Sequence, residues 1–429
     1  MAEKEDHEYV KPIDWSRIKL ADDELTRWIE KNIIIWRLEN IYKSMVEDPE
    51  KFDKLNGVGL GTLICDAGGI VALFDWDEEK VGVTEKQLIG LIDKGVKKLH
   101  ADYQKDPSVL HGGTADGVGQ TWAVLLGWAT WPVWEDLSED ARRKALQVLM
   151  KEAKLFEKPL RTWNYPNSNI EEHSPEASLY GLLSNMMPDH PLNKHWEYCT
   201  RHWTYGHVVA PAELKANPVF SDGTRLQDFV KYAPWSVGSI HDDGSVMNHE
   251  VVNFHYAMTS SCRFASLLWY NIGNRTPPDA LTTIGVKRTR DWFVRSVAPW
   301  GGHIAPDGYE YTPLYGSLFQ PNYYLLYWHP TPEVAKEIVE SGSALPGYNP
   351  FAEHYQLKLF GPLKKPARIM SPKELMKRLS GVHVAPTAKY VLHRSPAAFS
   401  TFSWHRYSAN GGLLNRDPIA LNTGGDGAS

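Results

Sequence analysis

The stretch "LSEDARRKALQVLMKEAKLF", residues 137–156, carries the pattern that decides the fold. Its apolar residues recur every three to four positions, which is the spacing of one face of an amphipathic helix. Ser138 stands at the position of an N-cap residue, and acidic residues fill the turn that follows it. The sequence therefore predicts a helix over 138–157 with one buried face.

The same periodicity continues along most of the chain. In "SPEASLYGLLSNMM", Ser174 is the expected N-cap and Pro175 the first helical residue. Further helices are expected at 22–46, 84–104, 194–207, 250–271, 278–296, 322–327 and 332–341. Helices joined by long polar loops predict helical hairpins in an incomplete (α/α) toroid over residues 1–384, and an irregular helical bundle is the alternative.

The residue composition of the chain changes near residue 385. The stretch "AKYVLHRSPAAFSTFSWHRYSANGGLLN", residues 388–415, is rich in β-branched and aromatic residues and in turn-forming Gly and Asn. Residues 385–429 are therefore predicted to be a β-rich C-terminal segment, either a short β-region or a truncated β-sandwich domain.

Composition narrows the class of protein. Apolar residues make up 42% of the 429 residues and charged residues 23%, which is typical of a folded globular chain. The formal net charge of −6 predicts no attraction to nucleic acid or membranes, and no stretch reaches the ~18 apolar residues of a membrane span. The start "MAEKEDHEYVKPIDW" lacks the apolar core of a signal peptide. We expect either a cytoplasmic chain or one whose leader has been removed.

Cysteine and aromatic usage add two expectations. Cys65, Cys199 and Cys262 are far apart and form no CxxC pair, so neither a disulfide framework nor a zinc ribbon is expected. The 17 Trp and 20 Tyr residues are numerous; most should pack between helices, and the rest could stack on sugar rings.

Proton-handling groups gather in "HDDGSVMNHEVVNFHYAMTSS", residues 241–261. If a helix follows the Asp-Gly turn, His249, Asn253 and Tyr256 share one of its faces. Imidazole, amide and phenol on a core-facing stripe would each need a buried partner. The stripe therefore favours a functional site, with a solvent-facing polar helix as the alternative.

Other clusters extend this candidate site. The stretch "WNYPNSNIEEHSPEA", residues 163–177, is either a capping loop or a carboxylate-binding loop with neutral donors. "GVKRTRDWFVRSV", residues 285–297, is either a solvated helix face or a group of cations that binds an anion or lowers the pKa of a tyrosine. The residues expected to contact substrate are Trp163, Glu172, His173, Asn253, Arg290, Arg295, His303, Tyr309, Tyr311 and His405.

A recurring set of His, Tyr, Asn and Arg fits β-elimination of a uronic-acid polysaccharide. Neutral or cationic donors stabilise the C6 carboxylate as the C5 proton becomes acidic. One group then takes the C5 proton and another protonates the leaving O4. This chemistry needs no cofactor, and without an HExxH or other tight ligand spacing we expect no catalytic metal. The residues predicted to be catalytic are His249, Tyr256, Asn167, Asn169 and Arg288.

Two motifs resemble those of known enzymes. "DGSVMNHEVVNFHY" resembles the DGS-x-x-x-H segment of chondroitin AC and hyaluronate lyases and is similar to the DGS segment of heparinase II/III-like lyases. "NSNIEEHSP" is similar to their upstream Asn-x4-Glu segment. The resemblance implies that His249 is the base, Tyr256 the acid/base tyrosine, and Asn167 or Asn169 the neutraliser of the carboxylate. It also implies an (α/α) toroid with a β-domain behind it and an anionic uronate polysaccharide or oligosaccharide as partner.

Other classes remain open from the sequence. An α/α-barrel glycoside hydrolase would use two carboxylates from among Asp116, Asp242, Asp243 and Glu172. A non-catalytic sugar-binding toroid would tolerate loss of the catalytic residues. A terpene-cyclase-like barrel is disfavoured because neither a DxDD nor a DDxxD motif is present. An unsaturated sugar product distinguishes the lyase from the hydrolase.

Overall fold

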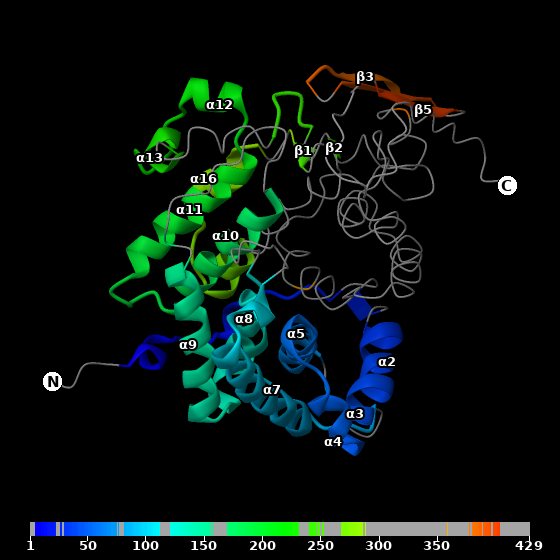
Figure 1. Cartoon of the computed structure of the whole chain (residues 1–429), viewed down its shortest axis with the longest axis vertical. Coiled ribbons are helices and arrows are strands. Elements are labelled where there is room, and N and C mark those ends of the chain that lie inside the picture. Colours follow the sequence, from blue (N-terminus) through cyan, green and yellow to red (C-terminus); the bar gives the residue numbers. More distant parts are fainter. Residues whose placement is uncertain are drawn as a thin grey trace.

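The structure is a computed structural model. It describes residues 5–22, 26–27, 30–74, 76, 81–111, 121–155, 157, 170–230, 240–245, 247–248, 251–252, 267–285, 288, 358, 377, 380–387, 389–395 and 398–403. Within these ranges the chain is mainly helical, as predicted (Figure 1). None of the described helices is long and apolar enough to cross a membrane.

Two long amphipathic helices confirm the periodicity of the sequence. Helix α7 (Glu85–Lys105) begins with a capping box, in which Thr84 Oγ1 accepts from Gln87 N at 3.1 Å and Gln87 Oε1 accepts from Thr84 N at 2.8 Å. Helix α9 (Glu139–Leu155) begins at the predicted N-cap, where Ser138 Oγ accepts from Ala141 N at 3.3 Å. Both helices bury the apolar face that their sequences predicted.

The N-terminal part contains shorter and less regular helices. The chain is helical from Glu30 to Glu47, but π-helical turns interrupt it on both sides of a short α-helix. The elements there are η3 (Glu30–Ile34), α2 (Ile35–Arg37), η4 (Leu38–Tyr42), α3 (Lys43–Glu47) and α4 (Pro49–Asp53). The 3₁₀-helices are η1 (Asp6–Tyr9), η2 (Trp15–Arg17), η5 (Pro107–Leu110) and η6 (Trp131–Asp136).

The later helices match the predictions less closely. Helix α11 (Asn193–Val208) is close to the prediction, whereas α10 (Ile170–Met186) begins before Ser174, so the predicted cap is wrong. Helix α16 (Asp279–Thr283) is followed by an extended Ile284 and by Gly285 with φ +66°, so the helix predicted over 278–296 is broken there. The remaining helices here are α12 (Pro211–Ala216) and α13 (Leu226–Val230). The helices predicted at 322–327 and 332–341 lie outside the described residues.

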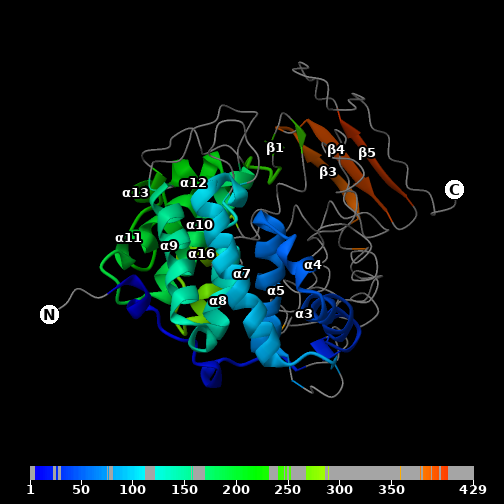
Figure 2. The ribbon, with the colours of Figure 1, turned by 60° about the horizontal axis from the view of Figure 1, so that its bottom comes forward.

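The main core lies where α5 (Gly57–Leu73), α7, α8 (Val124–Thr130) and α10 pack together (Figure 2). Glycines allow the helices to approach closely. A Cβ atom on Gly68 of α5 would lie 2.4 Å from the Ala129 carbonyl oxygen of α8. Trp131, Trp196 and Trp269 are fully buried in this core, which confirms the packing role expected for them. Cys65 and Cys199 are free and buried, whereas Cys262 lies outside the described residues.

The N-terminal segment connects distant parts of the helical body. Lys11 N donates to the Met186 carbonyl at the end of α10 at 2.8 Å, and Ala21 N donates to the Lys358 carbonyl at 2.7 Å. Lys358 in turn forms an ion pair with Glu30 and donates from Nζ to the Leu73 carbonyl at 2.7 Å. A residue late in the chain therefore packs against the first helices.

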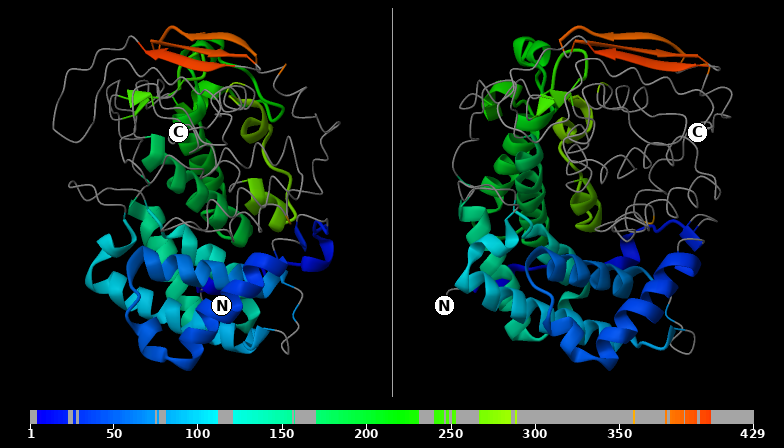
Figure 3. Two further views of the ribbon diagram at one scale, coloured as in Figure 1. Left: turned by 90° about the vertical axis from the view of Figure 1, so that its right-hand side faces the viewer. Right: turned by 45° about the vertical axis from the view of Figure 1, so that its right-hand side comes forward.

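The described part of the predicted β-region forms a three-stranded antiparallel sheet, in the order β3-β4-β5, and residues 404–429 lie outside the described residues. Its strands are β3 (Gly381–Ala385), β4 (Tyr390–Arg394) and β5 (Phe399–Ser403), so it begins at residue 381, slightly before the predicted 385. Tyr390 and Leu392 of β4 are buried, whereas Val384 and Phe402 on the other face are exposed. The sheet lies at one end of the molecule, far from the N-terminal helices drawn in blue (Figure 3).

Candidate functional site

Most of the residues predicted for the site lie outside the described residues. Glu172 and His173 fall in the first turns of α10, and the structure describes their backbone only. Arg288 is described with its side chain. The remaining predicted residues lie outside the described residues; they are His249, Tyr256, Asn167, Asn169, Trp163, Asn253, Arg290, Arg295, His303, Tyr309, Tyr311 and His405.

The helix predicted over 250–271 is wrong at its start. Met247–Asn248 (β1) and Val251–Val252 (β2) pair as a short antiparallel ladder, with Met247 opposite Val252. In sequence, His249 and Glu250 are the two residues that join these strands. The argument that placed His249 and Asn253 on one helix face therefore fails, because the segment between them is extended at Val251 and Val252.

The DGS turn, residues 241–245, is tied to elements on both sides. Gly244 has φ +89°, a conformation that glycine adopts without strain. Asp243 Oδ1 accepts from Ser245 N at 2.9 Å and from Ser245 Oγ at 2.6 Å, and Asp243 Oδ2 accepts from Thr387 N at 3.2 Å. Asp242 Oδ1 accepts from Ala212 N at the start of α12 at 2.8 Å. The turn thus connects α12 with the turn between β3 and β4.

Burial also changes the pKa of a histidine in this turn. Burial lowers the pKa of His241, and the neighbouring Asp243 and Asp242 oppose that shift. Both carboxylates already accept backbone N–H groups, which is the usual role of Asp residues in turns. That use leaves little support for Asp242 and Asp243 as the catalytic pair of a hydrolase.

Arg288 is bound by its own chain. Its Nη2 lies 2.6 Å from Glu213 Oε2 and donates to the Val208 carbonyl at 3.2 Å. The side chain is 16% exposed, and Gly285 packs close to it. A role in substrate binding would require Arg288 to exchange Glu213 for a substrate carboxylate, and its assignment as a catalytic residue stays a prediction.

A buried cluster around Glu152 was not predicted. Glu152, near the end of α9, has a side chain that is 0% exposed. Thr121 Oγ1 donates to Glu152 Oε2 at 2.6 Å, and Tyr103 OH of α7 donates to Glu152 Oε1. His111 Nε2 lies 3.0 Å from Oε2 and 3.2 Å from Oε1 of the same carboxylate. His111 Nε2 therefore faces both oxygens of the carboxylate.

Thr121 links this carboxylate to a second one. Its backbone N donates to Glu176 Oε1 of α10 at 3.4 Å, and its hydroxyl also accepts from Ala123 N at 3.2 Å. Glu176 is 1% exposed. His111 and Thr121 form an antiparallel bridge with each other, so the two ends of the 112–120 segment meet at the cluster.

Tyr103 is held in its protonated form. Burial, followed by the hydrogen bond and charge of Glu152, raises the pKa of Tyr103 above its usual value. Its hydroxyl is therefore a donor to Glu152 and is unsuited to be a base. Lys151 Nζ of α9 lies 4.9 Å from the centre of the Tyr103 ring.

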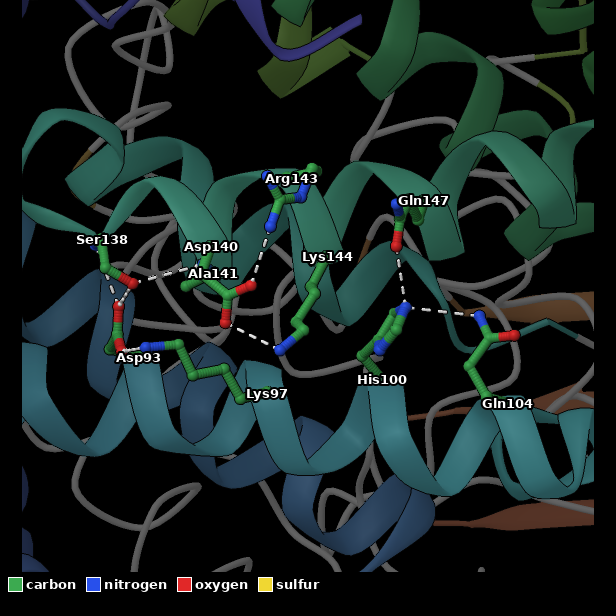
Figure 4. Close-up of polar contacts among 10 residues, drawn as sticks. All are labelled: Asp93, Lys97, His100, Gln104, Ser138, Asp140, Ala141, Arg143, Lys144 and Gln147. Atoms are coloured by element: carbon green, nitrogen blue, oxygen red, sulfur yellow. Dashed lines mark hydrogen bonds and ion pairs between the residues drawn. The ribbon is translucent and has the colours of Figure 1, made fainter.

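On their exposed side, helices α7 and α9 are joined by several polar contacts (Figure 4). Asp93 Oδ1 accepts from Ser138 Oγ at 2.6 Å, which joins α7 to the cap of α9. Further along, His100 Nε2 lies 2.9 Å from Gln147 Oε1. Burial lowers the pKa of His100, and the bond to Gln147 opposes this shift. These contacts fix the register of α7 against α9, from which Tyr103 and Glu152 project.

One signal in the sequence could have revealed the Glu152 cluster. In α9, Ala145, Val148 and Leu149 belong to the buried stripe, and Glu152 continues it at helical spacing. An acid in an apolar stripe needs buried donors. His111 borders the polar stretch "HGGTADGVGQTW", but nothing in the sequence pairs it with Glu152.

Among the described residues, no three His, Cys, Asp or Glu side chains converge on a point that could hold a metal ion. Comparisons of the chain with known protein families, curated proteins and solved structures find no match.

Proposed function

We propose that the chain is a polysaccharide lyase that cleaves a uronic-acid-containing polymer by β-elimination. Asn167 or Asn169 holds the C6 carboxylate. His249 takes the C5 proton, and Tyr256 protonates O4 as the C4–O4 bond breaks and the C4–C5 double bond forms. His and Tyr are suited to these roles because both exchange protons and neither needs a cofactor.

The anchoring of the DGS turn is the observation that carries the proposal. The motif that resembles the lyases continues directly from a turn bound to α12 on one side and to the β3–β4 turn on the other. A segment that begins at a junction of two structural layers is a frequent location for binding residues. The short β1–β2 pair is compatible with the proposal, because catalysis requires His249 and Tyr256 to reach one sugar ring and not to share a helix.

The toroid is part of the proposal. Helices that are close in chain order pack against each other: α5 on α7, α7 on α9, and α10 on α11. The described helices follow one another in an arc from α2 through α7 and α9 to α11 (Figure 1). The contacts of Lys358 with Leu73, Glu30 and Ala21 support a late segment that returns to the first helices, as ring closure requires.

The test is a screen of uronate polymers for the unsaturated product. Alginate, glucuronan, hyaluronan, chondroitin and heparin-like chains are each incubated with the protein, and ultraviolet absorbance of the unsaturated sugar is followed. We expect at least one polymer to give product. Reducing ends that appear without ultraviolet absorbance would instead establish a hydrolase.

Two variants then test the assigned residues. Tyr256→Phe and His249→Ala are each expected to lower turnover by about 10²-fold or more, the usual contribution of a general acid or base. Tyr9→Phe, on the N-terminal segment, and His195→Ala, on the surface of α11, are the matched controls and should keep parental turnover. A folded Tyr256→Phe variant with full activity would remove Tyr256 from the mechanism.

A further inference from the structure

The charges of the chain are distributed unevenly, and helices α7 and α9 form its basic part. Together these helices contain ten Lys and Arg and six Asp and Glu, which gives a formal charge of +4. The whole chain has a charge of −6, so the residues outside the two helices carry −10. A local excess of cations on an acidic chain indicates a surface that attracts anions.

The two helices run in the same direction, which brings their C-terminal parts together (Figure 4). Asp93 of α7 accepts from Ser138 at the start of α9 at 2.6 Å, and further along His100 lies 2.9 Å from Gln147. Because later residues of α7 meet later residues of α9, cations in the C-terminal parts of both helices lie near one another.

The cations are concentrated in those C-terminal parts. Residues 94–105 and 141–155 contain nine Lys and Arg but only two acids, of which Glu152 is buried. The helix dipole favours a cation in the last turn, which accounts for Lys105 and Lys154. The other seven cations lie before the last turns, so the dipole does not explain them. They are Lys94, Lys97, Lys98, Arg142, Arg143, Lys144 and Lys151.

Two of these lysines border a line of uncharged polar side chains. Lys144, Gln147 and Lys151 follow one another on α9 at spacings of three and four residues, so they share one face of the helix. Opposite them on α7 is His100, whose Nε2 lies 2.9 Å from Gln147 Oε1 and 3.3 Å from Gln104 Nε2. We call these five residues the basic strip.

The pKa of His100 indicates the sign of the potential on the strip. Burial lowers this pKa, and the charges of Lys144 and Lys151 lower it further, whereas the bond to Gln147 and the charge of Asp140 oppose the shift. The two lysines thus disfavour a positive charge at His100. The same field favours the negative charge of a ligand there.

Both lysines of the strip are accessible to a ligand. Lys151 is exposed, with Nζ over the Tyr103 ring, and no acid of the described structure forms an ion pair with it. Lys144 Nζ lies 2.7 Å from Asp140 Oδ2 in a pair whose side chains are 30% and 38% exposed. Partly exposed pairs contribute little to stability, so Lys144 can also bind a ligand carboxylate at small cost.

We propose that the basic strip binds a carboxylate-bearing polysaccharide along the exposed side of α7 and α9. Lys144 and Lys151 are roughly 10.5 Å apart along the helix and pair with two carboxylates of the polymer. Gln104, Gln147 and His100 bind hydroxyl groups between them. The choice of a uronate polymer as partner rests on the proposed function.

The side chains of the strip favour a polysaccharide over other anionic partners. Single-stranded nucleic acids stack their bases on aromatic side chains, and protein interfaces contain apolar and aromatic cores. The strip contains neither kind of side chain. Its two amides each offer both a donor and an acceptor, which suits the hydroxyl groups of a sugar.

The chain offers a matched pair of double variants. Lys144→Gln with Lys151→Gln removes two charges from the strip. Lys43→Gln with Lys215→Gln removes two charges elsewhere. Lys43, on α3, pairs with the acid Glu47 one turn away, as Lys144 pairs with Asp140, and Lys215 is exposed on α12. Thermal unfolding shows whether each variant is folded.

Binding is measured by flowing polymers over the immobilised full chain, so that cleavage does not deplete them. Alginate and heparin are the anionic polysaccharides, dextran is a neutral one, and polyglutamate is an anionic peptide. We expect at least one of the two anionic polysaccharides to bind the parent more tightly than dextran and polyglutamate do. The strip variant should bind it about fivefold more weakly or worse, and the control variant as the parent does. Raising salt from ~0.01 M to ~1 M, which shortens the screening length from about 30 Å to about 3 Å, should weaken binding to the parent more than to the strip variant.

Four results would overturn the inference. They are the absence of alginate and heparin binding at low salt, parental affinity in a folded strip variant, an equal loss in the control variant, and polyglutamate binding as tight as that of the polysaccharides. Any of these leaves the lyase proposal intact if the parent forms an unsaturated product. Conversely, binding through the strip without an unsaturated product from any uronate polymer would support the binding surface and refute the proposed function.

Discussion

Replacing Gly127 by alanine is expected to destabilise the protein by about 1–2 kcal/mol, although alanine is the better helix former. Gly127 lies in α8 against Leu182 of α10, which is fully buried. An added Cβ would lie 1.9 Å from Leu182 Cδ2 and 2.8 Å from Cδ1. Overpacking a core costs about 1–3 kcal/mol, and the gain in helix propensity offsets up to ~1 kcal/mol of that.

Two further substitutions turn this estimate into a test of the packing. Gly90→Ala, in α7, is the control, because Gly90 is exposed and an added Cβ meets nothing within 4 Å. It should stabilise the protein by about 0.5–1 kcal/mol. Leu182→Ala alone should cost about 2–5 kcal/mol. Combined with Gly127→Ala, it should cost less than the sum by about 1–3 kcal/mol, because the new methyl occupies space that Leu182 vacates.

Urea unfolding followed by tryptophan fluorescence measures these free energies. Trp128 of α8 and Trp269 stand with their ring centroids 3.6 Å apart, so two of the 17 tryptophans report on this part of the core. If Gly127→Ala were as stable as the parent, or if the two substitutions were additive, α8 and α10 would not be in contact at this point.

Three other changes test the remaining parts of the structure. Asp66→Ala should cost about 3–5 kcal/mol in urea unfolding, because Arg37, whose Nη2 lies 2.6 Å from Asp66 Oδ2, would remain buried without its partner. The hydrogen bond from Arg201 is the main reason that the pKa of Asp222 is lowered to about 2. The ionised Asp222 therefore stabilises the folded state at pH values above the unfolded pKa of ~3.9, and this stabilisation is lost as the pH falls toward 2. Asp222→Asn should remove that part of the pH dependence of Tm, and at pH 7 it should cost about 1 kcal/mol or less, because the side chain is 43% exposed. Asp243→Ala should speed proteolysis and amide exchange in the turn between β3 and β4, whereas unchanged exchange there would show that the hydrogen bond does not hold the turn.

Long helices could be predicted because their signal is local. In α7 and α9 the apolar spacing is repeated over several turns and the caps lie next to the first helical residue, so no distant contact is needed to define them. The predicted start of α10 is wrong because Ser174 and Pro175, judged only by residue type, are a favourable N-cap and first helical residue. The helix nevertheless begins at Ile170, because the preceding Ile-Glu-Glu-His run is compatible with a helix.

The β1–β2 pair could not be predicted by the same reasoning. Strands of two residues are too short for an alternating pattern, and a run such as "MNHEVV" fits helix and strand about equally. The turn directly before this pair in sequence is bonded to Ala212 and Thr387. Neither residue is near the turn in sequence, so a local pattern does not indicate these contacts.

For polar groups in the core, the sequence indicates which residues are buried acids but not which residues bind them. Asp66 in an otherwise apolar α5 and Glu152 in the apolar stripe of α9 both violate the helix pattern, so the sequence does indicate that each must have buried donors. It does not indicate which ones. Tyr42 binds Asp66 from 24 residues away, and Tyr103 binds Glu152 from 49 residues away. Because such partners come from other helices, an acid in an apolar stripe predicts that several segments meet at one point, and only the fold reveals which segments those are.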